Sequence, residues 1–221
     1  YNDNLAHLRD VARELAIEHA QPFANVHDTM FNAMERAKAT LGEAYHVCGA
    51  DGFHPWSNGH LLMAQAFLEA LEVDGAIGTI TVDLANNSAS ATEGHRVQSI
   101  EKGRVSITST RYPFCFYGTA NDPAGTRSIA PFTNFNDRFN RFTLRLTGLD
   151  AAAADVRWGE HTRRFTKEQL ERGVNLAAAF IDSNPFHPAF FELARRTSIK
   201  QQFETVMIKE VVTRFRGRND A

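Results

Sequence analysis

The chain has 221 residues, of which 43% are hydrophobic and 23% are charged, a composition typical of a globular protein. Its 24 Lys and Arg residues nearly balance its 26 Asp and Glu residues, so no excess of positive charge is available to neutralise the phosphates of a nucleic acid. No apolar run approaches the roughly 20 residues that a membrane-spanning helix needs, and two cysteines are too few for a disulfide scaffold.

The first third of the chain has the periodicity of helices. Apolar residues at helical spacing predict helices over residues 4–20, 29–41 and 59–72. Pro22 ends the first helix and Gly42 ends the second, while Ser57 or Asn58 can cap the third. Residues 23–28 (FANVHD) have the length of a short buried strand. The order helix, strand, helix, loop, helix predicts an α/β architecture with a mostly parallel sheet.

The pattern changes near residue 74. Residues 76–165 alternate apolar and polar side chains between Gly, Asn and Asp, and they predict an antiparallel unit of about six strands. One hairpin is expected to turn at Gly159 and Glu160. A polar loop over residues 118–137 interrupts this unit. The aromatic run before it, residues 111–118 (RYPFCFYG), is expected to be buried as a strand, with a carbohydrate platform as the alternative.

The last part of the chain is predicted to be helical. Thr166 and Gln169 have the spacing of a capping box that begins a short helix. Asn175 is expected to cap the turn that follows by bonding backbone. A long helix is predicted over residues 188–216, with an apolar face that packs against a core. The three patterns divide the chain into predicted parts 1–73, 74–165 and 166–221.

A short segment before the third helix combines an acid, an imidazole, a proline and a tryptophan: residues 50–60, ADGFHPWSNGH. Asp51 and His54 are three residues apart in a loop. This spacing lets the carboxylate reach Nδ1 of the imidazole and leaves Nε2 as a base. Pro55 biases His54 away from the helical conformation. An Asp–His pair of this kind activates a hydroxyl nucleophile in acyl transfer.

The stretch ADGFHPWSNGHLLMAQAFL resembles the last conserved block of the SGNH, or GDSL-type, esterases and lipases. The resemblance extends over residues 1–73 and implies the C-terminal part of a flavodoxin-like, three-layer hydrolase domain. Residues 74–165 would then be an appended β-rich domain, followed by a helical C-terminal segment over residues 166–221. The resemblance also implies that Asp51 orients the imidazole, that His54 is the general base, and that the reaction needs no cofactor.

The family's nucleophile lies in a G-D-S block and its oxyanion hole uses a G-x-N-D block. Neither block precedes the Asp–His segment of this chain, and we assign neither Asn2 as an oxyanion donor nor Ser57 as a nucleophile. The resemblance therefore implies a chain that supplies only the Asp–His part of a triad. The chain begins inside a predicted helix and without a methionine, which favours a piece of a longer hydrolase over a degenerate relative.

The leading hypothesis is a serine-type ester hydrolase that acts on an acylated carbohydrate or another small ester, a substrate class that follows from family analogy. Trp56, beside the base, is expected to line the substrate pocket. One alternative is a non-catalytic carbohydrate- or protein-binding protein with a degenerate hydrolase portion. Another is a metal site built from His46, His54 and His60.

The expected partners are the ester substrate and the missing N-terminal part of the hydrolase, with neither nucleic acid nor a membrane. A secreted or periplasmic location is expected for a carbohydrate esterase, although no signal peptide is visible. Export would allow Cys48 and Cys115 to pair, and two buried thiols are the alternative.

Overall fold

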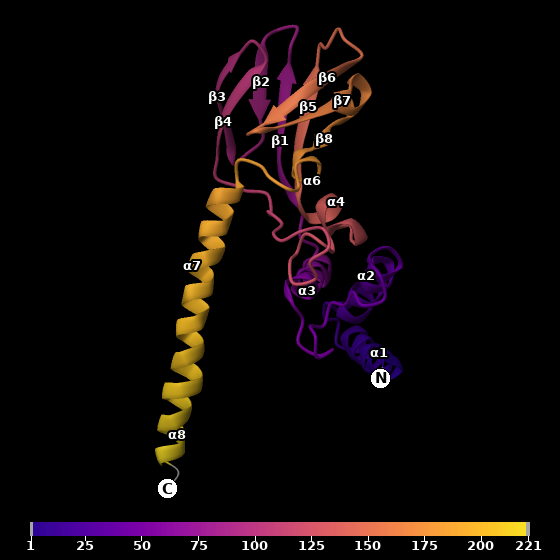
Figure 1. The fold of residues 1–221 in the computed structure, drawn as a ribbon, viewed down its shortest axis with the longest axis vertical. Coiled ribbons are helices and arrows are strands. Elements are labelled where there is room, and N and C mark those ends of the chain that lie inside the picture. Colours follow the sequence, from indigo (N-terminus) through magenta and orange to yellow (C-terminus); the bar gives the residue numbers. More distant parts are fainter. Residues whose placement is uncertain (1, 220–221) are drawn as a thin grey trace. The chain divides into compact units, whose positions relative to one another are not determined.

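The structure is a computed structural model that describes residues 2–219 (Figure 1). The chain divides into two compact units, Tyr1–Asn184 and Pro185–Ala221. The first unit contains helices α1–α6 and strands β1–β8, and the second contains the helical segments α7, η2 and α8. None of the helices within residues 2–219 combines the length and the apolarity that crossing a membrane requires.

Helices α1 (Asn2–Glu18), α2 (Val26–Leu41) and α3 (Ser57–Ala70) confirm the three helices predicted from periodicity, with ends shifted by a few residues. Helix α2 packs against α3. Its small residues Ala33 and Ala37 are buried, which lets the two helices approach closely. Gly42 ends α2 as predicted, with φ at +103° and its N–H donating to the carbonyl of Lys38.

The strand predicted over residues 23–28 is wrong. Residues 21–25 have no regular structure, and α2 begins at Val26, where the N–H of Asp28 donates to Oδ1 of Asn25 at 3.2 Å. A strand needs a neighbour whose N–H and C=O groups pair with its own. Since no strand lies within residues 2–75, the mostly parallel sheet expected in this part is not formed there.

Residues 76–175 contain three sheets (Figure 1). A four-stranded sheet has the order β2–β1–β5–β8, from β1 (Ala76–Asp83), β2 (Ser88–Ala91), β5 (Arg141–Thr147) and β8 (Val174–Asn175). Two hairpins, β3–β4 and β6–β7, are formed by β3 (His95–Glu101), β4 (Arg104–Ser109), β6 (Ala153–Trp158) and β7 (His161–Thr166). Trp158 pairs with His161, which confirms the predicted turn at Gly159 and Glu160.

Strands β1 and β5 pair in parallel, with Ile80 opposite Leu144, so the prediction of a wholly antiparallel unit is wrong. Alternation of apolar and polar residues reports which face of a strand is buried, but not the direction of its neighbour. Buried His95 joins β3 to this sheet, because its Nε2 lies 2.9 Å from the carbonyl oxygen of Ile77 and its Nδ1 lies 2.9 Å from Oγ of Ser109.

Residues 112–139 pack with the helices. Phe116 and Ile129 are buried in the same cluster as Ala37 and Leu62 of α2 and α3. The predicted aromatic strand over residues 111–118 is therefore buried in part but is not a strand. Its backbone pairs with a side chain instead: the N–H of Phe114 donates to Oδ1 of Asn140 at 2.7 Å, and Nδ2 of Asn140 donates back to the carbonyl of Phe114 at 3.0 Å.

Three short helices complete the first unit: η1 (Ala130–Phe132), α4 (Phe135–Phe139) and α5 (Lys167–Arg172), with a single turn α6 (Leu176–Ala179) after β8. The capping box at the start of α5 is confirmed, because the N–H of Gln169 donates to Oγ1 of Thr166 and the N–H of Thr166 donates to Oε1 of Gln169. Asn175 caps α6 by accepting the N–H of Ala177 at 3.2 Å, as predicted.

The second unit is a run of helical segments, α7 (His187–Val206), η2 (Met207–Val212) and α8 (Thr213–Asn219), which confirms the long predicted helix. Segment η2 is π-helical. Ion pairs such as Lys200–Glu204 and Glu210–Arg214 follow the polar side. The apolar side is exposed, including Phe203 and Phe215, so the predicted core packing is not met within this unit, which has no second layer.

Candidate functional site

A tight loop between α2 and α3 positions the Asp–His pair. The N–H of Gly52 donates to the carbonyl of Gly49, and φ at Gly49 is +65°. A Cβ at Gly49 would lie 2.2 Å from the carbonyl oxygen of His54, so the loop can close this tightly only with glycine there. Oδ1 of Asp51 accepts the N–H groups of Phe53 and His54, both at 2.9 Å. The loop is therefore built around one carboxylate.

The contact expected from the Asp-x-x-His spacing is present, since Nδ1 of His54 lies 2.7 Å from Oδ2 of Asp51. The hydrogen bond from His54 and those from two backbone N–H groups lower the pKa of Asp51 below its usual range. An ionised carboxylate can only accept, so Nδ1 of His54 carries the hydrogen. Among the hydrogen bonds within residues 2–219, none involves Nε2 of His54, and the side chain is 79% exposed. Nε2 is thus open to a substrate or a second residue.

The start of α3 is anchored by Asn58, which is fully buried. Its Nδ2 donates to the hydroxyl of Tyr45 at 3.1 Å and to the carbonyl of His46 at 2.9 Å. Gly59 allows the backbone of α3 to lie close to that of Val47, because a Cβ at Gly59 would lie 2.1 Å from the carbonyl oxygen of Val47. The expected capping by Ser57 or Asn58 is wrong: Trp56 occupies the N-cap position without a side-chain hydrogen bond.

The hydroxyl of Ser57 is hydrogen-bonded to a tyrosine and not to the base. Its Oγ is hydrogen-bonded to the hydroxyl of Tyr117, which also donates to the carbonyl of Ala124 at 3.2 Å. No serine hydroxyl within residues 2–219 is hydrogen-bonded to His54. Tyr117 was not singled out from the sequence, because it lies 60 residues from Ser57 and no local pattern reports such a contact.

The three histidines of the metal hypothesis have separate contacts. The ring of His46 lies 4.9 Å from that of Trp56, while Nδ1 of His60 lies 2.9 Å from the carbonyl oxygen of Trp56. The described part of the chain has no group of three or more His, Cys, Asp or Glu side chains placed to hold a metal ion. The indole of Trp56 covers His46, and its role toward a substrate stays a prediction.

The motif letters G-x-N-D do occur once in the chain, at residues 217–220. This string comes after the Asp–His segment, the reverse of the order expected from the resemblance. Residues 217–219 belong to α8, in the second unit. We assign it no role in the site.

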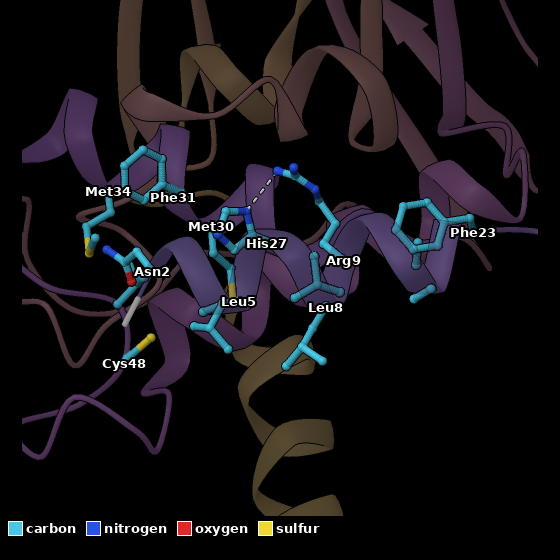
Figure 2. A pocket seen from close by; sticks show the side chains of 14 residues that line it. Asn2, Leu5, Leu8, Arg9, Phe23, His27, Met30, Phe31, Met34 and Cys48 are labelled. Carbon is cyan, nitrogen blue, oxygen red and sulfur yellow. Dashed lines mark hydrogen bonds between the residues drawn. The ribbon is translucent and has the colours of Figure 1, made fainter. Parts of the chain in front are cut away.

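An apolar pocket of about 450 Å³ lies between α1, α2 and the start of the Asp–His loop (Figure 2). Leu5 and Leu8 of α1 and Met30 of α2 are among its lining residues. Cys48 and Phe23 lie at opposite ends of the pocket in Figure 2. Burial raises the pKa of the Cys48 thiol, and the negative charge of Asp51 raises it further. The pocket therefore reaches the neighbourhood of the Asp–His pair at its Cys48 end.

A polar cluster ties α1 to α2 beside this pocket. The guanidinium of Arg9 pairs with Asp28, and Nδ2 of Asn25 donates to Oδ2 of Asp28 at 2.7 Å. Nδ1 of His27 lies 2.8 Å from Oδ1 of Asp28. These hydrogen bonds, with that of His27 the largest cause, lower the pKa of Asp28 to about 2. The cluster is the main polar link between two helices that share few other contacts.

Helix α1 has an apolar face that the described residues do not cover. No residue of α1 is buried, and Leu8, Val11 and Leu15, which lie on one face of the helix, are 65%, 54% and 49% exposed. A row of apolar side chains on one helix is usually buried against another layer. This exposed apolar face adjoins the apolar pocket, since Leu8 belongs to both.

Both cysteines are free thiols, so the pairing considered for an exported protein is not formed. Cys48 is half-buried beside the apolar pocket, and Cys115 is buried. Burial raises the pKa of Cys115 to about 11, so this thiol stays protonated at neutral pH.

No protein-family model matches the chain, and no curated protein matches it. Among solved structures, it is similar to BT4096, a gut microbial diltiazem-metabolizing enzyme. The two are 19% identical, with a TM-score of 0.61 over 99% of this chain and 57% of the other. The chain thus spans little more than half the length of that structure. At this level of identity the likeness is one of fold: a mixed α/β arrangement that is also found in an enzyme.

Proposed function

We propose that the chain is the base-bearing part of a serine-type ester hydrolase of the SGNH, or GDSL-like, type. One observation carries the proposal: Nδ1 of His54 is hydrogen-bonded to an ionised Asp51, and Nε2 of His54 is open. This is the arrangement of the base and its orienting acid in a catalytic triad. The likeness of fold to an enzyme supports it at the level of architecture.

In the proposed reaction, Nε2 of His54 removes the proton of a serine hydroxyl as the serine oxygen attacks the ester carbonyl. The resulting imidazolium then gives that proton to the leaving alcohol, and an acyl-enzyme remains. A water molecule, deprotonated by the same nitrogen, attacks the acyl-enzyme, and the imidazolium returns the proton to the serine oxygen as the acid is released. Asp51 holds Nδ1 as a donor throughout and stabilises the positive charge on the ring.

The serine and the oxyanion donors are proposed to lie outside residues 1–221. Within residues 2–219, no serine hydroxyl is bonded to His54. The exposed apolar face of α1 and the apolar pocket beside Cys48 offer a surface on which the rest of a hydrolase domain could pack. Such packing would exclude water from the Asp–His pair, and electrostatic interactions are stronger where water is excluded.

In the proposed flavodoxin-like, three-layer domain, the added part would supply the sheet, and α1 would cover one face of it. The proposed substrate class, an acylated carbohydrate or another small ester, follows from the family resemblance alone. Trp56 is proposed as a wall of the substrate pocket.

The test uses the protein as its gene encodes it, with residues 1–221 in their natural context. We expect hydrolysis of p-nitrophenyl acetate, and a loss of about 10³-fold or more in kcat/KM in His54→Ala. The matched control is His19→Ala, an exposed histidine after the end of α1, which should leave kcat/KM unchanged. Undiminished turnover in His54→Ala would exclude the assigned base. A wild-type protein with no turnover would favour the alternative of a binding protein.

A covalent label then locates the nucleophile. Reaction with phenylmethylsulfonyl fluoride, followed by mass spectrometry of the peptides, should place the modified serine outside residues 1–221. A modified serine within residues 1–221 would contradict the proposed division of the triad. Release of acetate from acetylated sugars, compared with release from p-nitrophenyl acetate, tests the carbohydrate preference separately.

A further inference from the structure

A cleft of about 440 Å³ lies between α2, α3 and the segment that contains η1 and α4 (Figure 1). Most of its lining side chains are polar, among them Thr29, Asn32, Arg36, Gln65, Asn134 and Asp137. We call it the polar cleft. Among the described residues, none that lines this cleft also lines the apolar pocket or belongs to the Asp51–His54 pair.

Hydrogen bonds between distant segments hold the walls of the polar cleft in place. Gln65 of α3 is buried, and its Nε2 donates to Oδ1 of Asn134 at 2.8 Å while its Oε1 accepts from the hydroxyl of Thr133. Arg36 of α2 donates from Nε at 3.1 Å and from Nη2 at 2.7 Å to the carbonyl of Phe132. The walls are therefore set by the fold, and a ligand would not have to order them.

Several polar groups of the lining have hydrogen-bonding capacity left over. The amide of Asn32, the hydroxyl of Thr29 and the carboxylate of Asp137 make no hydrogen bond or ion pair within residues 2–219. In the same part of the chain, Nδ2 of Asn134 has no acceptor. Asn32 lies on α2 and Asp137 on α4, so the unused donors and acceptors come from opposite sides of the cleft.

The charges of the lining nearly cancel. Arg36 is the one cation among the described lining residues, and two carboxylates, those of Asp28 and Asp137, belong to the same lining. Asp28 is paired with Arg9, which leaves Arg36 and Asp137 with opposite charges. A phosphate or carboxylate ligand would meet as much negative as positive charge, so the lining favours a neutral ligand.

The unused groups match hydroxyls. A hydroxyl donates one hydrogen and also accepts, so it can pair with an amide N–H, an amide oxygen or a carboxylate. Pro131 and Phe132 add apolar surface to the lining. The C–H groups of a sugar ring are attracted to the electron-rich face of an aromatic ring. A molecule that combines many hydroxyls with a C–H face fits both parts of the lining.

We infer that the polar cleft binds a neutral mono- or disaccharide. Its hydroxyls would pair with Asn32 on one side and with Asp137 on the other, and its C–H groups would lie against Phe132. The volume of about 440 Å³ falls within the range of roughly 300–1,000 Å³ that small-molecule sites have. The cleft would hold the sugar without cleaving it, and the inference does not rest on the proposed esterase chemistry.

Saturation-transfer difference NMR tests the inference on the protein as its gene encodes it. The probes are glucose, galactose, mannose, cellobiose, maltose and lactose. We expect saturable binding of at least one of them, with a Kd of about 1 mM or tighter. Glucosamine and glucose 6-phosphate, a cationic and an anionic analogue of glucose, should bind no more tightly than the best neutral probe. Absence of saturable binding by all six neutral probes, or tighter binding of either charged analogue, would overturn the proposal.

Variants then locate the bound sugar. Asn32→Ala and Asp137→Ala should each weaken the best probe about tenfold, with unchanged circular dichroism spectra, because neither side chain has a partner within residues 2–219. The matched controls, Asn121→Ala and Asp150→Ala, change exposed residues outside the cleft and should leave the affinity unchanged. Wild-type affinity in both cleft variants would contradict the assigned site.

His54→Ala separates this inference from the proposed esterase. Loss of the base should abolish ester hydrolysis but leave the affinity for the sugar as in the wild type, because His54 does not line the cleft. A protein that binds the sugar and hydrolyses no ester would retain the cleft and lose the proposed function. Loss of sugar binding in His54→Ala would place the sugar at the Asp–His pair and overturn the cleft.

Discussion

Asp51 and His54 are joined by two hydrogen bonds. Oδ2 of Asp51 accepts from Nδ1 of the His54 imidazole at 2.7 Å, and Oδ1 of Asp51 accepts from the backbone N–H of His54 at 2.9 Å. The carboxylate therefore shapes the loop and orients the ring at once. These two roles can be separated by Asp51→Asn. An amide oxygen still accepts the backbone N–H, but an amide NH₂ facing Nδ1 favours the wrong tautomer of the ring.

We expect Asp51→Asn to lower kcat on p-nitrophenyl acetate by about 10³- to 10⁴-fold while changing the melting temperature little. Steady-state kinetics and thermal melting by circular dichroism measure the two effects on the same sample. Asp150→Asn, an exposed aspartate elsewhere in the first unit, is the control. A large fall in melting temperature with an equal fall in activity would mean that Asp51 is structural only.

Because the pKa of Asp51 is lowered, protonation of this carboxylate does not limit activity in mild acid. A carboxyl group whose pKa is lower in the folded protein than in the unfolded protein stabilises the folded state. This stabilisation is complete above the unfolded pKa of about 3.9, and it is lost as the pH falls through the folded pKa. The Asp51 carboxylate therefore stays ionised above about pH 4. We expect the acid limb of the pH profile of kcat/KM to show no step near pH 4. A step there in the wild type that disappeared in Asp51→Asn would contradict this expectation.

The lowered pKa of Asp28 predicts that the link between α1 and α2 weakens in acid. Its pKa falls from 3.8 to about 2, so its contribution to stability is complete above about pH 4 and is lost as the pH falls toward 2. Asp28→Asn should reduce the free energy of unfolding at neutral pH by about 1 kcal/mol, since the cluster is partly exposed. The variant should also lose less stability between pH 4 and pH 2 than the wild type. Urea titrations at several pH values measure both, with Asp150→Asn as the reference.

Gly59→Ala tests the close approach of α3 to the Asp–His loop. The added Cβ would lie 2.1 Å from the carbonyl oxygen of Val47 and 2.8 Å from Cβ of Pro55, so the loop must move. We expect a loss of about 1–3 kcal/mol in stability and a fall in esterase activity. Gly217→Ala places the same methyl group in open space on α8 and should not destabilise the protein. Equal stability of both variants would show that the loop adapts freely.

Asn58→Ala removes the buried amide that fixes residues 45–46 to α3. The hydroxyl of Tyr45 and the carbonyl of His46 would each lose a donor, and we expect a loss of about 2–3 kcal/mol in the free energy of unfolding. Tyr45→Phe removes only the hydroxyl end of the network and should cost about 1 kcal/mol. Urea unfolding with an unchanged m-value checks both. A smaller loss in Asn58→Ala than in Tyr45→Phe would contradict this ranking.

Local features could be predicted from the sequence because short-range interactions decide them. The helices follow the spacing of apolar residues, Gly42 ends α2 through its positive φ, and Thr166 with Gln169 forms a capping box from side chains three residues apart. The contact between Asp51 and His54 belongs to the same class. In each case both partners lie within one turn of chain.

Features that depend on distant partners could not be predicted. Segment 23–28 has strand composition, but a strand forms only where another strand pairs with it, and none is available within residues 2–75. The parallel pairing of β1 with β5 and the bond between Ser57 and Tyr117 join residues about 60 positions apart. Alternation and spacing carry no information about such partners.

The π-helical segment η2 has a consequence for the geometry of the C-terminal helix. In an α-helix, a step of four residues overshoots a full turn by about 40°, so a row such as Phe203, Met207, Val211 and Phe215 would spiral around the axis. A π-helical turn contains more residues, so the same step falls short of a full turn. The overshoot in the α-helical part and the shortfall in η2 offset each other, so the four side chains stay on one side of the helix. Deleting Lys209 would return η2 to α-helical geometry, and the remaining 11 steps of about 100° from Phe203 to Phe215 make about three full turns, so the azimuth of Phe215 relative to Phe203 should change little.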